Sequence, residues 1–139
     1  MRNLDNFVKK LRDSGLRPTK QRIKICEVLF KPEKTFHFTI NDLTKIIQNK
    51  LNEKISLATV YNTVHAFKRK GYLKEISIST EKSYFDTNTS FHHHFFDIKS
   101  NDLIDIESSQ IEIKNIPNPP KGKSIKKIDV VINVENDSQ

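Results

Sequence analysis

The chain has 139 residues, enough for one ordinary domain or two small ones, and 35% of them are hydrophobic. This low hydrophobic content predicts small cores and favours a dimer that buries more surface. A formal net charge of +7, with a pI of about 9.5, favours a polyanionic partner, nucleic acid first, although a lysine-rich proteome bias explains it equally simply.

Cysteine count and hydropathy exclude several protein classes. The single cysteine, Cys26, excludes an intramolecular disulfide framework and any cysteine-rich zinc site. No apolar stretch approaches the roughly 18 residues that span a bilayer, so we expect no membrane segment. The first five residues carry a charge too early for a signal peptide, and a soluble, cytoplasmic protein is expected.

Periodic apolar residues predict two helices before Pro32. The apolar residues of the first helix recur at spacings of three and four residues, and this helix is expected to end near Gly15. The second helix is expected to be capped by Thr19. Cys26 falls on the buried side of the second helix, as a small core residue rather than a reactive thiol. The expected core positions are Leu4, Phe7, Val8 and Leu11, then Ile23, Cys26, and Leu29 or Phe30.

Two more helices are predicted between Pro32 and Gly71. Thr39 caps the third, with Asp42 at its third position, and Ser56 caps the fourth. The expected buried stripes are Ile40, Leu43, Ile46 or Ile47, and Leu51, then Leu57, Val60, Val64 and Phe67. The sides and front of the fourth helix are left to Thr59, Tyr61, Asn62, His65 and Ala66.

Residues 72–78 alternate, turn near residue 80 and return as residues 83–86, which predicts a β-hairpin. Helices followed by a two-stranded wing describe a winged helix-turn-helix, which places one helix in the DNA major groove. The alternative is a small α/β domain without nucleic acid. The basic charge and the polar front of the fourth helix favour DNA.

Polar, turn-prone residues after Asp86 predict a domain boundary. We therefore expect a winged-helix DNA-binding domain at 1–86, a linker at 87–90 and a second domain at 91–139. The second domain is predicted to hold strands at 91–98, 103–106 and 125–134, with prolines at 117–120 that forbid a long helix. Three strands bury little surface alone, so dimerisation through this antiparallel sheet is expected.

Three of the five histidines are consecutive and lie in the first of these strands. Alternation places His92 and His94 on one face and His93 on the other, apolar face. In the next strand Ile104 and Ile106 share the apolar face, which leaves Asp105 on the opposite one. Two imidazoles on one face suit a cation or a haem iron; a surface strand with incidental histidines is the alternative.

Several motifs in order resemble the ferric uptake regulator (Fur) family, over about residues 8–132. They are LRDSGLRPTKQR at 11–22, SLATVYNTV at 56–64 and the histidine cluster. The resemblance implies an α+β, dimeric metalloregulator, with an N-terminal winged helix-turn-helix followed by a small antiparallel-sheet dimerisation domain.

Details within the family indicate its iron response regulator (Irr) branch. Asn62 stands where the usual pattern has arginine, and residues 97–100 lack the usual Cys-x-x-Cys pair of a structural zinc site. YFDTN at 84–88, TVYNT at 59–63 and HHHFF at 92–96 look like that branch, which senses haem. No Cys-Pro haem motif occurs, so haem capture would depend on the histidine strand.

The resemblance also implies binding residues. A regulatory metal site for Fe(II), Mn(II) or Zn(II) would be formed by His37, Asp86, His92, His94 and Asp105. Candidate haem ligands are His92, His93 and His94, with His93 favoured as a core or interface residue. Candidate DNA contacts are Arg17, Thr59, Tyr61, Asn62, Lys68, Arg69 and Lys70; Thr59 and the basic helix end also have structural explanations.

These inferences predict a homodimeric, haem-responsive regulator of iron and haem metabolism. It would bind an A·T-rich two-fold operator when iron or haem is scarce and be inactivated by haem. The nearest alternative is a Fur-type repressor that senses Fe(II), Mn(II) or peroxide, since many iron sensors have glutamate where Asp86 stands. A metallohydrolase lacks a nucleophile and a placed base, so no enzyme is expected, and a haem-binding carrier leaves Tyr61 and Arg17 unexplained.

Overall fold

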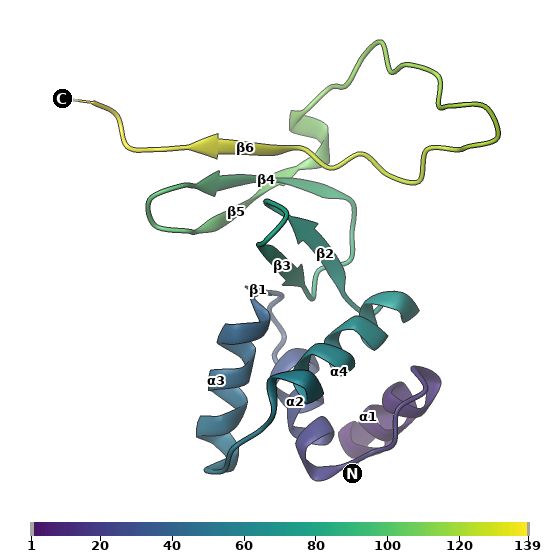
Figure 1. The fold of residues 1–139 in the computed structure, drawn as a ribbon, viewed down its shortest axis with the longest axis vertical. Coiled ribbons are helices and arrows are strands. Elements are labelled where there is room, and N and C mark those ends of the chain that lie inside the picture. The colour runs from purple at the N-terminus through teal and green to yellow at the C-terminus, as the bar shows by residue number, and fades with distance from the viewer. Residues whose placement is uncertain (1, 139) are drawn as a thin grey trace. The chain divides into compact units, whose positions relative to one another are not determined.

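A computed structural model describes residues 2–138, which form two compact units (Figure 1). The first unit ends at Thr89 and the second begins at Ser90. Four α-helices and two three-stranded sheets are present among the described residues, which confirms the α+β class. Each unit has its own sheet.

Three of the four helices of the first unit begin directly after the capping residues predicted for them. The four helices are α1 (Arg2–Asp13), α2 (Lys20–Phe30), α3 (Ile40–Leu51) and α4 (Leu57–Lys70). Helices α2, α3 and α4 are capped by the hydroxyls of Thr19, Thr39 and Ser56. Each hydroxyl accepts a hydrogen bond from the backbone N–H three residues later, at 3.2, 3.1 and 3.0 Å respectively. Gly71 ends α4 with φ +91°, a left-handed conformation that favours glycine.

The core of the first unit joins all four helices to the wing. Its fully buried side chains are Leu11, Ile25, Cys26, Leu43, Ile47, Val60, Val64 and Phe67, with Phe7, Leu29, Phe38, Leu73 and Phe85 nearly so. Most predicted core positions are confirmed, and Cys26 is a core residue.

Two predicted core residues, Leu4 and Leu57, are exposed. Leu4 and Leu57 are 48% and 53% exposed because each lies one turn before the first core-facing residue of its helix. Of the alternatives Ile46 and Ile47, Ile47 is the buried residue and Ile46 is 37% exposed. Conversely Ala66, which we placed on the side or front of the fourth helix, is buried.

The wing sheet has three strands rather than two. The predicted hairpin is present as β2 (Lys74–Ser77) and β3 (Ser83–Asp86), and β1 (His37–Phe38) pairs antiparallel with the other edge of β3. A two-residue strand shows no alternation, so the sequence could not predict it. Its register places His37 opposite Asp86 and Phe38 opposite Phe85.

The second unit is a sheet in the order β5-β4-β6, formed by β4 (His92–Asp97), β5 (Leu103–Glu107) and β6 (Val131–Val134). A short 3-10 turn, η1 (Ser108–Gln110), follows β5. The β4–β5 pair is antiparallel, as predicted, whereas β6 runs parallel to β4, so the sheet is mixed.

The last strand begins at Val131, not at Ile125 as predicted. The backbone N–H of Val130 donates to the His93 ring, while the Val130 carbonyl accepts the His94 N–H at 3.1 Å, so backbone pairing with β4 begins at this residue. No helix in the described part of the chain is long and apolar enough to cross a membrane.

Candidate functional site

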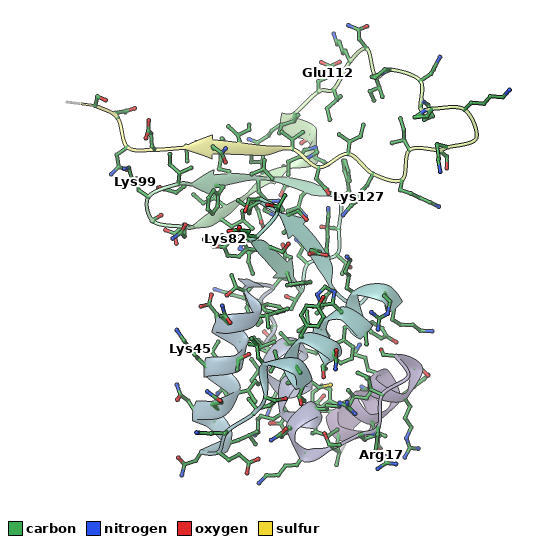
Figure 2. All side chains as sticks on the ribbon, in the orientation of Figure 1. Arg17, Lys45, Lys82, Lys99, Glu112 and Lys127 are labelled. Carbon is green, nitrogen blue, oxygen red and sulfur yellow. The ribbon has the colours of Figure 1, made fainter. Side chains whose placement is uncertain are left out.

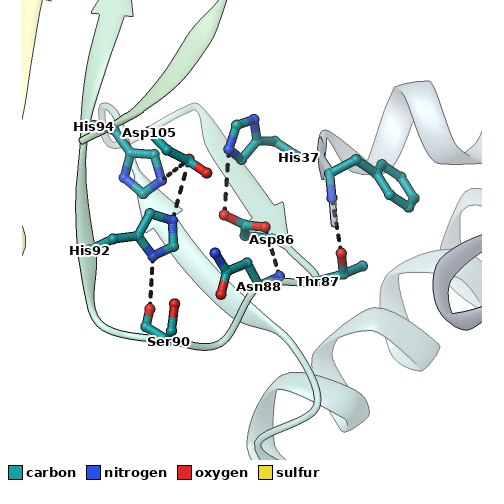
Figure 3. A network of polar contacts seen from close by, with 9 residues as sticks. His37, Asp86, Thr87, Asn88, Ser90, His92, His94 and Asp105 are labelled. Atoms are coloured by element: carbon teal, nitrogen blue, oxygen red, sulfur yellow. Dashed lines mark hydrogen bonds and ion pairs between the residues drawn. The ribbon is translucent and has the colours of Figure 1, made fainter. Parts of the chain in front are cut away.

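The second unit brings together His92, His94 and Asp105, which we call the histidine face. His94 lies opposite Asp105 in the β4–β5 register, and His92 is two residues away on the same side of β4. Figure 3 shows both rings directed at this carboxylate: their Nε2 atoms lie 3.3 and 3.2 Å from Asp105 Oδ1. The two rings are 4.5 Å apart, and both side chains are buried.

The orientation of His92 favours a cation at this face. Its Nδ1 lies 2.8 Å from the Ser90 carbonyl oxygen, which can only accept, so Nδ1 carries the proton. A neutral His92 therefore presents an Nε2 lone pair to the Asp105 carboxylate, and two acceptors at this distance repel unless a proton or a metal ion lies between them. Metal-binding histidines commonly donate their other N–H in this way.

His93 lies on the opposite face of the sheet. The Val130 N–H donates to its Nδ1 at 3.1 Å, so a neutral His93 carries its proton on Nε2 and has no free lone pair for a metal. Its ring packs edge-on against Phe91, 5.1 Å away, and is 1% exposed. This environment is that of a core residue.

The first unit brings together His37 and Asp86, which we call the wing pair. Their adjacent strands β1 and β3 place His37 Nε2 3.4 Å from Asp86 Oδ2 (Figure 3). Asp86 is 1% exposed, and its Oδ1 accepts the Asn88 N–H at 2.8 Å. A buried carboxylate held in one orientation, next to an imidazole, is a suitable pair of metal ligands.

The donor atoms of both groups are nitrogen and oxygen only. Imidazole and carboxylate ligands suit divalent iron, manganese or zinc, whereas a structural zinc site of the cysteine type needs thiolates. Cys26 lies in the core of the first unit, and burial raises its thiol pKa to about 12. The raised pKa favours the neutral thiol, in keeping with a core residue.

The predicted DNA-reading helix α4 exposes Tyr61 and Asn62 on its outer side. Tyr61 is 52% exposed, although its ring is largely apolar. Thr59 has a structural role, because its hydroxyl lies 2.7 Å from the Ser56 hydroxyl in the helix cap. Tyr61 and Asn62 remain free to meet a ligand along one surface.

The basic candidates differ in their surroundings. Lys68 forms an ion pair with Glu75 of β2, whereas Arg69 and Lys70 are exposed at the end of α4. Arg17 is exposed on the surface of the first unit (Figure 2), and its carbonyl accepts a hydrogen bond from the Arg22 guanidinium at 3.0 Å. The side chains of Arg17, Arg69 and Lys70 are thus accessible from solvent.

Sequence reasoning missed the contacts that orient these groups. The Ser90 carbonyl and the Asn88 N–H carry no side-chain signal that would identify them. His65 was placed on α4 without a role, yet its ring packs on Tyr61 at 4.1 Å. The spacing of four residues on one helix was the signal for that contact.

Comparison with known proteins identifies the fold and its relatives. Residues 13–133 match the model of the Ferric uptake regulator family. The Peroxide-responsive repressor PerR of Staphylococcus epidermidis is 31% identical over 109 residues, which are 78% of this chain and 71% of that protein. The Ferric uptake regulation protein of Vibrio cholerae is 35% identical over 103 residues, 73% of this chain and 67% of that protein.

A solved structure, the Ferric uptake regulator from Pseudomonas aeruginosa with manganese, shares the fold. Its TM-score is 0.65 at 22% identity, over 95% of this chain and 98% of that one. The likeness confirms the predicted combination of a winged-helix domain and a small sheet domain.

Proposed function

Because this chain belongs to the ferric uptake regulator family of DNA-binding transcription regulators, we propose that it is a repressor of iron homeostasis controlled by a divalent metal ion. The observation that carries the metal proposal is the orientation of His92. Its N–H is donated to a backbone carbonyl, and its lone pair is directed at the Asp105 carboxylate. A cation removes the repulsion between these two acceptors.

The proposed metal ligands are the histidine face and the wing pair together: His37, Asp86, His92, His94 and Asp105. Iron(II) and manganese(II) accept such mixed nitrogen and oxygen donors, and zinc(II) is a further candidate. A bound ion would tie the sheet unit to the DNA-binding unit, since each contributes ligands. Fixing the orientation of the DNA-binding unit is how metal binding would change DNA affinity.

The proposed DNA surface is centred on α4 in the major groove. Tyr61 would contact a thymine methyl group and Asn62 would pair with adenine, which suits an A·T-rich operator. Arg17 would enter the minor groove, with Thr59, Lys68, Arg69 and Lys70 near phosphates. Lys68 would first have to exchange Glu75 for a phosphate.

The proposed assembly is a homodimer through the second unit. On the side opposite the histidine face, Phe95 lies beside Ile104 and Ile132 in the strand register. Ile104 is 52% exposed and Ile132 39%, so this row of apolar side chains gains from burial against a second copy. A two-fold dimer would present two α4 helices to a two-fold operator.

A second candidate function is haem sensing, as in the Irr branch. It is favoured by the Irr-like motifs and by the lack of cysteines after the histidine strand. Haem would bind through His92 or His94, inactivating the regulator when haem is plentiful. Peroxide sensing is a variant of the metal proposal, suggested by Asp86 and by the similarity to a peroxide-responsive repressor.

One set of binding measurements separates these functions. A duplex selected by the protein from a random pool is compared with a scrambled duplex at fixed salt, because affinity depends steeply on salt. The protein is tested after chelation, then with manganese(II), iron(II), iron(II) plus peroxide, and haem. DNA binding that requires manganese or iron supports the metal proposal. Peroxide sensing is supported if peroxide abolishes DNA binding by the iron-loaded protein but not by the manganese-loaded protein.

Loss of binding with haem alone would replace the metal proposal by haem sensing. A Soret band shift that is abolished in a His92→Ala/His94→Ala variant would support that outcome, and His93→Ala is the matched control. Separately, Tyr61→Ala should cost about 1–3 kcal/mol on the selected duplex. An unchanged ratio of selected to scrambled affinity would remove Tyr61 from base reading.

A further inference from the structure

Three aromatic rings of the first unit form a continuous contact from the outer side of α4 to the wing. The Tyr61 and His65 rings lie 4.1 Å apart, tilted by 38°. His65 in turn packs edge-on against Phe85 of β3, at 5.4 Å and 82°. Tyr61 is half exposed, His65 is partly buried and Phe85 is 2% exposed, so the contact runs from surface to core.

The inner end of this contact is fixed by the wing sheet. Phe85 lies opposite Phe38 in the β1–β3 register, and their rings stack 5.9 Å apart. These phenylalanines are the chain neighbours of Asp86 and His37, the wing pair. Any change in the separation of His37 and Asp86 therefore acts on the same two backbone segments that hold Phe38 and Phe85.

The outer end has a clear physical consequence for Tyr61. An exposed tyrosine on a helix samples several side-chain rotamers, and ordering it on DNA costs entropy. A ring packed against its face from the next helical turn restricts that sampling before DNA arrives. Such preorganisation raises affinity without a new contact to the ligand.

His65 is suited to this role because its surroundings favour the neutral imidazole. Burial lowers the pKa of its imidazole, and the nearby Lys68 and Arg69 lower it further, against the opposing effect of Glu75. A neutral ring packs against Tyr61 and Phe85 without the desolvation penalty of a charge.

We propose that His65 is a positioning residue that orients Tyr61 for base reading, and that Phe85 and Phe38 couple this pair to the strands of the wing pair. This inference rests on the proposed function, since it requires that Tyr61 reads bases and that His37 and Asp86 bind metal. It adds a route, within one unit, by which the metal site acts on the reading side chain.

The first test replaces His65 by leucine, which removes the ring, and by phenylalanine, which keeps a ring. We expect His65→Leu to lower the ratio of selected-duplex to scrambled-duplex affinity about tenfold, whereas His65→Phe keeps it within about threefold. Ile46→Ala, an exposed apolar change on α3, is the control and should leave the ratio unchanged. Thermal unfolding identifies any variant that fails to fold.

A double-mutant cycle decides whether His65 acts through Tyr61. In the Tyr61→Ala background, His65→Leu should cause no further loss of discrimination. Additive losses would show that His65 contributes independently and would overturn the inference.

The second measurement is the manganese-induced gain in selected-duplex affinity. A merely structural role of His65 would leave this gain unchanged. His65→Leu should bind manganese(II) as tightly as the wild type by calorimetry, yet show a smaller manganese-induced gain in selected-duplex affinity. An unchanged gain would overturn the coupling to the wing. A wild type without specific DNA binding would instead overturn the proposed function itself, so the two failures are distinguishable.

Discussion

The two units of this protein differ in how many apolar side chains they bury. The first buries a connected core of helix and wing side chains, from Phe7 to Phe85. In the second, the buried hydrophobic side chains of the described residues are only Phe96, Leu103 and Ile106, and its three other buried residues are histidines. A unit with so little apolar burial depends on something outside itself, and a metal ion and a second copy are the two candidates proposed.

The largest effect is expected in the core of the first unit. Phe67→Ala removes a fully buried ring that packs edge-on on Phe30 and Tyr72, and should lower the free energy of unfolding by about 3–5 kcal/mol. Chemical denaturation monitored by circular dichroism measures it. A loss below about 1 kcal/mol would contradict the view of this unit as the self-sufficient one.

The second unit, which buries little apolar surface, should be stabilised by metal binding. Manganese(II) at about 100 times its dissociation constant should stabilise the protein by about 2.7 kcal/mol, because only the folded state binds the ion. Hydrogen exchange of β4 and β5 amides, with and without the ion, locates the effect. In His94→Ala the stabilisation should vanish, whereas His93→Ala should retain it; equal behaviour of these variants would contradict the assignment of faces.

Dimerisation provides a sharper contrast between the faces of the second unit. Ile104→Lys adds a charge to an exposed position, and on a free surface such a change alters stability by less than about 0.5 kcal/mol. At a dimer interface it should shift the protein to monomer, measurable by sedimentation. Ile98→Lys, at another exposed apolar position of this unit, is the control. A dimer that tolerates Ile104→Lys would place the interface elsewhere.

The smallest effect expected is a pH dependence of the first unit. Burial lowers the folded-state pKa of His65 below its ordinary value of 6.5, so below that pH the unfolded state binds more protons. Stability should therefore fall as pH drops from about 7 to about 5, and His65→Phe should fall less. Identical pH profiles for the two proteins would show that His65 titrates normally.

Prediction from sequence succeeded where local signals agree with tertiary packing. The hydroxyl caps at Thr19, Thr39 and Ser56 are each confirmed, because capping involves only residues within one helical turn. Strand alternation likewise separated His92 and His94 from His93. The resemblance to the Fur family is confirmed, whereas the Irr branch and its haem response stay proposals.

Prediction failed where the secondary structure of a segment depends on residues that are distant in the sequence. β1 has only two residues, and it is a strand because β3 offers an edge to it. The last strand was predicted six residues too early because its start depends on where the chain reaches β4. Val130 meets that strand 37 residues away from His93 along the chain, donating to the His93 ring and accepting the His94 N–H. Branched residues alone do not define where pairing begins.

The sequence by itself determined the helices, their caps, the faces of the histidine strand and the family, since these follow from spacing and side-chain chemistry. Only the tertiary structure decided which ring nitrogens of His92 and His93 meet backbone groups. His92 donates to a carbonyl and His93 accepts from an amide, and both partners are backbone groups positioned by the fold. It also decided that Tyr61, His65 and Phe85 touch, because that contact needs a helix and a strand packed together.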